Sequence, residues 1–277
     1  MSTQPPSPNP AARRRFSAIV LGGDRAPGDP LPEAAGVPCK ALVPVAGTPM
    51  VLRVLNALAD SSWIGERILC GPPEVAWRDN AALRQAVEGG GFRWMENQSS
   101  PSLSASRAMA DLPPERPVLI TTADHALLEG PIIDHFCAHA EGGDWDVVVA
   151  LADHGQVTHA FPGVHRTALR FRDAAYSGCN LFAILTPEGR RIAEFWTRIE
   201  NQRKNPFRVV SAAGWMAVLR YLLGHLTLEE GLRRISRRLD LRVGALLLPY
   251  PQAAVDVDTV EDWHLVERLA SSTAAPA

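Results

Sequence analysis

Long apolar runs and closely spaced metal-binding side chains are both missing from this sequence. No run approaches the roughly 18 consecutive apolar residues of a membrane-spanning helix, so we expect no membrane span. The four cysteines form no C-x-x-C pair, and the eight histidines include no H-E-x-x-H motif. These absences argue against a structural zinc site or a disulfide framework, and they favour reduced thiols in a cytoplasmic protein.

An excess of charge is also missing. The formal net charge is −2 at pH 7, so no overall field attracts nucleic acid and we expect no nucleic-acid partner. Hydrophobic residues make up 46% of the 277 positions, which is enough for a sizeable core. The ends at 1–15 and 271–277 are rich in small residues and proline and lack periodicity. This predicts disordered tails around a single domain at 16–270.

Strand-like and helix-like patterns alternate through the first half of the chain. Strand patterns occur at 16–21, 67–70, 92–95, 118–123 and 146–151. Helical patterns lie between them, at 81–87, 102–112, 131–140 and after Thr48, which we expect as an N-cap with Pro49 at the first helical position. The alternation predicts an α/β fold with a doubly wound, mostly parallel sheet, in which ligands bind at the carboxyl ends of strands.

The second half of the chain is richer in helical patterns. We expect strands at 180–185, 243–248 and 254–257, helices at 188–200, 207–224 and 228–239, and a terminal helix from Thr259. Thr227 and Glu230 form a capping-box pattern before the helix 228–239. The helix 207–224 is unusually apolar, so it is either a core or dimer-interface helix or a contact for a membrane surface or lipid-like acceptor.

The first strand pattern leads into a glycine-rich loop and then a single lysine. Leu21 is followed by Gly22 and Gly23, and a Gly/Pro-rich stretch then delivers Lys40. Glycines let backbone N–H groups approach a phosphate closely because no Cβ intervenes, and a nearby lysine balances phosphate charge. This order favours a nucleoside triphosphate site. The alternative is an ordinary strand–loop–helix turn.

Carboxylates follow two of the predicted strands. Asp124 stands after the strand 118–123, where it either binds Mg²⁺ or caps the following turn. Asp256 and Asp258 alternate on the last strand pattern, so both side chains face one side and can reach one cation. The alternative is that one of them, or Thr259, caps the terminal helix.

Basic side chains in the second half are candidates for binding a phosphate group of a second substrate. Arg203 and Lys204 form a cluster with Arg208, for which the alternative is a solvated helix end. Arg170 and Arg172 are further candidates.

The segments around the glycine loop and Lys40 resemble a known family. The stretch LGGDR at 21–25 and the stretch PCKALVPVAGTPM at 38–50 are similar to the N-terminal signature of nucleotidyltransferases with a glycosyltransferase-A-like fold, most closely the MobA-like branch. The family's usual G-x-R is replaced here, and Arg25 is the stand-in for its arginine. The resemblance recurs at 121–124 and 256–262, so it spans about 16–270.

The resemblance implies roles for individual positions. Lys40, Asp124 and Asp258 would be catalytic; Asp124 and Asp258 would hold Mg²⁺, with Asp256 as an alternative ligand. The nucleotide-binding set would be Leu21, Gly22, Gly23, Arg25, Lys40 and Ser102, although Ser102 fits a helix N-cap equally well. Asn180 would bind the acceptor. The basic residues Arg203 and Lys204 are expected beside it from their charge, and the helical region 186–242 is expected to form the acceptor side.

The predicted reaction is transfer of a nucleoside monophosphate from a nucleoside triphosphate to a phosphorylated small-molecule acceptor, with release of pyrophosphate and with Mg²⁺ as cofactor. The resemblance favours CTP or GTP. The acceptor would be a sugar phosphate, a polyol phosphate or a lipid head-group precursor. Two alternatives are a nucleotide-sugar-dependent glycosyltransferase of the same fold and a catalytically inactive nucleotide-binding protein.

Overall fold

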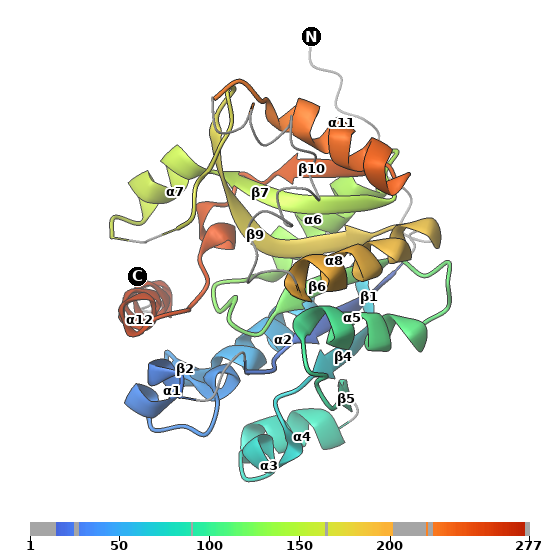
Figure 1. Ribbon diagram of the computed structural model, residues 1–277. Coiled ribbons are helices and arrows are strands. Elements are labelled where there is room, and N and C mark those ends of the chain that lie inside the picture. Colours follow the sequence, from blue (N-terminus) through green and yellow to red (C-terminus); the bar gives the residue numbers. More distant parts are fainter. Residues whose placement is uncertain are drawn as a thin grey trace.

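The computed structural model describes residues 15–24, 28–89, 91–163, 166–201, 220 and 224–274. Its centre is a sheet of eight strands in the order β10-β7-β9-β6-β1-β4-β5, with β8 paired to β9 (Figure 1). The strands are β1 (Phe16–Leu21), β4 (Ile64–Cys70), β5 (Arg93–Met95), β6 (Val118–Thr122), β7 (Val147–Asp153), β8 (Leu169–Arg170), β9 (Ala175–Ile184) and β10 (Val243–Leu247). The strand β9 runs antiparallel to β6, β7 and β8, and the other pairs are parallel.

Helices cover both faces of this sheet (Figure 1). The longer helices are α2 (Met50–Asp60), α4 (Ala81–Glu88), α5 (Pro101–Ala110), α6 (Gly130–Glu141), α8 (Ile192–Asn201), α11 (Leu228–Leu239) and α12 (Val260–Ala274). Shorter ones are α1 (Pro30–Ala35), α3 (Glu74–Trp77), α7 (His154–Ala160), and the 3-10 turns η2 (Lys40–Leu42), η3 (Glu188–Arg191) and η4 (Pro251–Ala254). The expected mostly parallel α/β sheet is therefore confirmed.

The strand β1 shows why the sheet needs both layers. Phe16, Ala18 and Val20 pack into the cluster that contains α2 and α6, whereas Ile19 packs into the cluster that contains α5 and α8. Successive side chains of a strand point to opposite faces, so a strand with apolar side chains on both faces is buried on both. The apolar run that follows the buried Ser17 therefore forms a central strand.

A third apolar cluster fixes the C-terminal segment beside the N-terminal loop. Leu31 of α1 and Val43 belong to one cluster with Val255 and Val257 of the segment that leads into α12, and with Val266 of α12 itself. All five side chains are at most 1% exposed, so the two segments are held firmly together. This packing brings the region around Lys40 to the region around Asp258.

Three sequence-based predictions are corrected by the structure. Thr48 does not cap α2: Thr48–Pro49 is the strand β3, which pairs with β2 (Pro44–Val45), and the helix starts at Met50. The predicted strand at 254–257 is absent from the described region, where η4 ends at Ala254 and an extended segment follows. The helix α12 continues to Ala274, inside the expected tail at 271–277.

Other expectations fall outside the described residues, among them the first fourteen positions and nearly all of the apolar segment 207–224. The capping box of Thr227 and Glu230 is present at the start of α11. Among the helices of the described residues, none is long and apolar enough to cross a membrane.

Candidate active site

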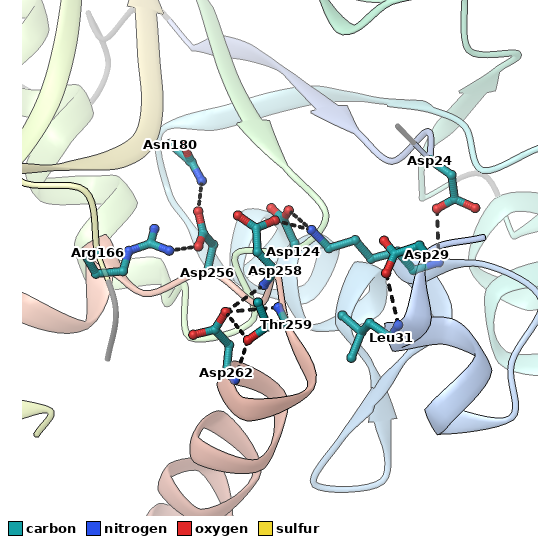
Figure 2. A network of polar contacts seen from close by, with 11 residues as sticks. Asp24, Asp29, Leu31, Asp124, Arg166, Asn180, Asp256, Asp258, Thr259 and Asp262 are labelled. Atoms are coloured by element: carbon teal, nitrogen blue, oxygen red, sulfur yellow. Dashed lines mark hydrogen bonds and ion pairs between the residues drawn. The ribbon is translucent and has the colours of Figure 1, made fainter. Parts of the chain in front are cut away.

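The lysine of the loop after β1 lies between two of the predicted carboxylates. Lys40 Nζ is 2.7 Å from Asp124 Oδ2 and 2.5 Å from Asp258 Oδ1. The three residues come from distant parts of the chain and meet at one place, as the dashed contacts in Figure 2 show for both aspartates. The structure thus brings together the three residues predicted to be catalytic.

Backbone pairing at the carboxyl ends of β1 and β6 places Asp124. The two strands are parallel neighbours, and the Ala123 N–H donates to the Leu21 carbonyl at 2.9 Å, just beyond the paired residues. The Val257 N–H donates to the carbonyl oxygen of Asp124 at 3.1 Å. This bond ties the segment before α12 to the end of β6, and it sets Asp258 opposite Lys40.

Local hydrogen bonds fix the other two members. The backbone N–H of Lys40 donates to Asp24 Oδ1 at 3.1 Å, which anchors the start of η2 to the end of the glycine loop. Asp262 Oδ2 accepts from the N–H groups of Asp258 and Thr259, at 3.2 and 3.0 Å. Thr259 Oγ1 in turn accepts from the Asp262 N–H at 3.1 Å, so Thr259 caps α12, which is one of the alternatives that the sequence left open. The side chain of Asp258 remains turned toward Lys40 (Figure 2).

The Lys40 ammonium is charged in this setting. Burial acts to lower its pKa, but the carboxylates of Asp124 and Asp258 outweigh burial and raise it above the usual value. The Asp124 side chain is 10% exposed, whereas the Asp258 side chain is 43% exposed. The site is therefore closed on the side of β6 and open on the side of Asp258.

The third predicted carboxylate belongs to a separate contact. Asp256 Oδ1 accepts from Arg166 Nη1, and Asp256 Oδ2 accepts from Asn180 Nδ2 at 2.7 Å. Asn180 holds this position with a φ of 47°, a left-handed conformation that asparagine tolerates better than most residues. Both oxygens of Asp256 are thus engaged beside the Lys40 group (Figure 2).

The donor set can be tested for the Mg²⁺ that the resemblance implies. Among the described residues, no group of three or more His, Cys, Asp or Glu side chains is arranged to hold a metal ion. Mg²⁺, however, is usually bound by one or two carboxylates together with substrate phosphates and water. Asp124 and Asp258 already converge on one cationic nitrogen, so their oxygens fit such a two-carboxylate site.

The glycine loop is tightly packed against a second loop. The Gly22 N–H donates to the Cys70 carbonyl at 2.8 Å, and a Cβ added to Gly22 would lie 3.2 Å from the Gly71 oxygen. A Cβ on Gly23 would lie 3.0 Å from the side chain of Asn97. A side chain at either position would therefore require its neighbour to shift by a few tenths of an ångström, and the Gly22 N–H is already used within the protein.

Of the remaining predicted residues, Ser102 lies in the described part of the chain. Ser102 is fully buried in α5; it contacts Ser100 Oγ at 3.0 Å and accepts from Thr197 Oγ1 at 3.1 Å. The N-cap of α5 is Ser100, not Ser102. Arg25, Arg203 and Lys204 lie outside the described residues.

Sequence reasoning missed two residues that the structure places in the site. Asp24 anchors the Lys40 backbone, and Arg166 reaches Asp256 from the segment between α7 and β8. Asp24 lies inside the stretch at 21–25 that carries the family resemblance, and this position is the signal that could have identified it. Arg166 carried no local signal, because its partner Asp256 is 90 residues further along the chain.

Solved structures share this fold. A hypothetical transferase from Thermus thermophilus is 29% identical, with a TM-score of 0.74 over 90% of this chain and 99% of the other. A CMP:2-keto-3-deoxy-manno-octonic acid synthetase complexed with CTP is 12% identical, with a TM-score of 0.56 over 93% of this chain and 99% of the other. The 4-diphosphocytidyl-2C-methyl-D-erythritol synthase from Anaerococcus prevotii DSM 20548 is 12% identical, with a TM-score of 0.51 over 93% and 96%.

These similarities define the fold as that of glycosyltransferase-A-like nucleotidyltransferases. Residues 18–243 match the family model of the MobA-like NTP transferase domain, so the chain belongs to this family. Among curated proteins, none matches the chain significantly. The resemblance drawn from the motifs is thereby confirmed, and nucleotidyl transfer is the activity of the class.

Proposed function

We propose that this protein transfers a nucleoside monophosphate from CTP or GTP to a phosphorylated small-molecule acceptor and releases pyrophosphate. The observation that carries the proposal is the position of Lys40 Nζ between Asp124 and Asp258 at the carboxyl ends of β1 and β6. Ligands of open α/β sheets bind at this edge. A cation and two carboxylates at that point suit a triphosphate that arrives with a divalent metal ion.

The acceptor supplies the nucleophile. An oxygen of its phosphate forms a bond to the α-phosphorus of the triphosphate, while the bond from the α-phosphorus to the bridging oxygen breaks and pyrophosphate leaves with the electron pair. A phosphate monoester is largely ionised at neutral pH, so no side chain needs to remove a proton. Such a reaction depends on positioning and on charge neutralisation.

Lys40 supplies part of that neutralisation. Its ammonium group donates to the phosphate oxygens, on which negative charge grows as the bond to the leaving pyrophosphate breaks. Asp124 and Asp258 would hold Mg²⁺, which when bound supplies Lewis-acid stabilisation of the same phosphates. Asp24 keeps Lys40 in place through the backbone bond at 3.1 Å.

The nucleotide and the acceptor are proposed to enter from opposite sides. Leu21 ends β1 and Gly23 lies in the loop that follows; both are proposed to line the nucleotide side with Lys40, because Asp24 of the same loop accepts from the Lys40 backbone. Arg25, Arg203 and Lys204 keep the sequence-based roles of nucleotide and acceptor binding. Asp256 is left out of the proposed metal set, since Arg166 and Asn180 occupy both its oxygens.

Pyrophosphate release across the four common nucleoside triphosphates, each with a panel of sugar and polyol phosphates and Mg²⁺, tests the proposal. CTP is the first choice because one structural neighbour was solved with it. We expect release to require both a phosphorylated acceptor and one preferred nucleotide. Turnover of a nucleotide sugar instead would identify a glycosyltransferase, and tight nucleotide binding without any turnover would identify an inactive relative.

A further inference from the structure

One buried arginine in the site has no role in the reaction described above. Arg166 lies between α7 and β8, and its side chain is 13% exposed. Among the described residues, its hydrogen-bond partner is Asp256, reached through Nη1. A guanidinium has five N–H donors in a planar fork, so within the described part of the chain the contact through Nη1 occupies only part of the donor capacity of Arg166.

Arg166 is directed toward the cluster around Lys40. Figure 2 shows its guanidinium pointing at Asp256, and Asp258 and Asp124 lie beyond Asp256 as seen from Arg166. The same proximity appears in its electrostatics: burial lowers the pKa of Arg166, and the carboxylates of Asp258, Asp262 and Asp124 act to raise it. The guanidinium therefore lies within electrostatic reach of both proposed metal ligands.

The contacts of Asp256 hold this arginine in one orientation. Asp256 is 7% exposed and receives Arg166 on one oxygen and Asn180 on the other. Asn180 adopts a left-handed backbone conformation within β9 while its amide reaches the carboxylate. An ion pair this buried is a weak source of stability, because desolvation offsets most of the attraction. We therefore attribute the fixed orientation of Arg166 to binding of a ligand rather than to a gain in stability.

We propose that Arg166, oriented by Asp256, receives the phosphate group of the acceptor. The inference rests on the proposed function and names the residue that recognises the second substrate. The planar fork of an arginine matches two oxygens of a phosphate, which an ammonium group meets only as a point charge. Asp256 and Asn180 are then positioning residues, which act on the acceptor through Arg166.

The test uses the full-length protein with Mg²⁺ and a CTP analogue that has a methylene bridge between its α and β phosphorus atoms, or the matching GTP analogue. Calorimetric titration with inorganic phosphate and with glycerol 3-phosphate gives the affinity of the loaded protein for each anion. Arg166→Gln should weaken both anions by about tenfold or more and leave the analogue's affinity nearly unchanged. Arg166→Lys, which keeps the charge without the fork, should give an intermediate loss.

Two controls separate recognition from damage to the fold. Arg107→Gln removes an arginine that is 61% exposed on α5 and should change neither affinity. Asp256→Asn should weaken anion binding in the wild-type background but have little further effect in Arg166→Gln, because a residue that acts through its partner loses its effect with that partner. Additive effects of the two substitutions would contradict the positioning role of Asp256.

The outcomes distinguish this inference from the proposed function. If the wild-type protein binds no nucleotide analogue, the proposed function fails. If it binds the analogue but neither anion at millimolar concentration, or if Arg166→Gln leaves anion affinity unchanged, the inference fails alone. Loss of nucleotide and anion binding together would assign Arg166 to the triphosphate, which also overturns the inference.

Discussion

Lys40 Nζ lies 2.7 Å from Asp124 Oδ2, although the two residues are 84 positions apart in the chain. The same nitrogen contacts Asp258 Oδ1 at 2.5 Å, across 218 positions. The ammonium group thus lies between the two carboxylates that are proposed to hold Mg²⁺. Three of the predictions below follow from this arrangement.

Asp124→Asn should abolish turnover and leave the fold intact. The substitution removes the negative charge of a side chain that is 10% exposed and is proposed to hold Mg²⁺. Transition-state stabilisation of several kcal/mol should therefore be lost. Pyrophosphate release at saturating Mg²⁺ measures the effect, and circular dichroism checks the fold. Asp79→Asn, an exposed aspartate after α3, is the matched control. Activity close to that of the wild type would remove Asp124 from the mechanism.

Lys40→Ala should lower kcat/KM for the triphosphate by more than about tenfold, a barrier change above about 1.4 kcal/mol. The reason is the loss of the cation that is proposed to meet the growing phosphate charge. Steady-state kinetics at fixed acceptor concentration give the value, with Arg107→Gln as the control for removing a positive charge elsewhere. Unchanged triphosphate kinetics would show that Lys40 does not contact the phosphates.

The same Lys40→Ala variant should bind Mn²⁺ more tightly in the absence of nucleotide. In the wild type the ammonium group is attracted to Asp124 and Asp258, so a divalent ion must compete with it there. The Lys40 ammonium repels a divalent ion between the two carboxylates. Because solvent screens this repulsion strongly, removing the ammonium should raise the affinity for Mn²⁺ by about tenfold. Electron paramagnetic resonance of free Mn²⁺ measures the binding. An affinity equal to that of the wild type would mean that these carboxylates are not the metal site.

Asp146 should make stability depend on pH in the acid range. Hydrogen bonds from Arg242 lower its pKa from 3.8 to about 2, with the hydroxyl of Thr186 as a further donor. A carboxyl whose pKa is lowered in the folded state stabilises the fold above its unfolded pKa, and the contribution disappears as pH falls through about 2. Because Arg242 is half-exposed, we expect about 1 to 2 kcal/mol at neutral pH.

Denaturant unfolding of Asp146→Asn at several pH values checks this prediction. The difference between this variant and the wild type in free energy of unfolding should have its full value at pH 7 and should shrink between about pH 4 and pH 2. Asp144→Asn is a matched control, since Asp144 pairs with the same arginine but its side chain is 87% exposed. A difference that does not vary with pH would assign the effect to packing rather than to the charge of Asp146.

Local patterns predicted most elements because each depends on residues close in the chain. The strand β1 (Phe16–Leu21) and the helix α11 (Leu228–Leu239) have the expected bounds. The turn at Ala46 and Gly47, both with positive φ, instead makes Thr48–Pro49 the second strand of a small hairpin. A two-residue loop of this kind fits a hairpin, so turn chemistry outweighed the helix-start pattern of Thr48.

The segment before α12 shows a limit of reading strands from apolar alternation. Val255 and Val257 are at most 1% exposed, yet the segment is not a strand. They are buried by α1 and the loop after η2, and alternation reports burial whether or not a partner strand is present. Without a partner strand, Asp256 contacts Arg166 and Asn180, whereas Asp258 contacts Lys40.

The sequence by itself determined the alternation of strands and helices, the glycine loop before Lys40, and the position of Asp124 after a buried strand. Periodicity and turn chemistry act over a few residues, so they can be read locally. Only the tertiary structure decided that Lys40 lies between Asp124 and Asp258, and that Asp256 orients Arg166. These contacts join segments 84 to 218 positions apart, and packing of the third apolar cluster sets their geometry.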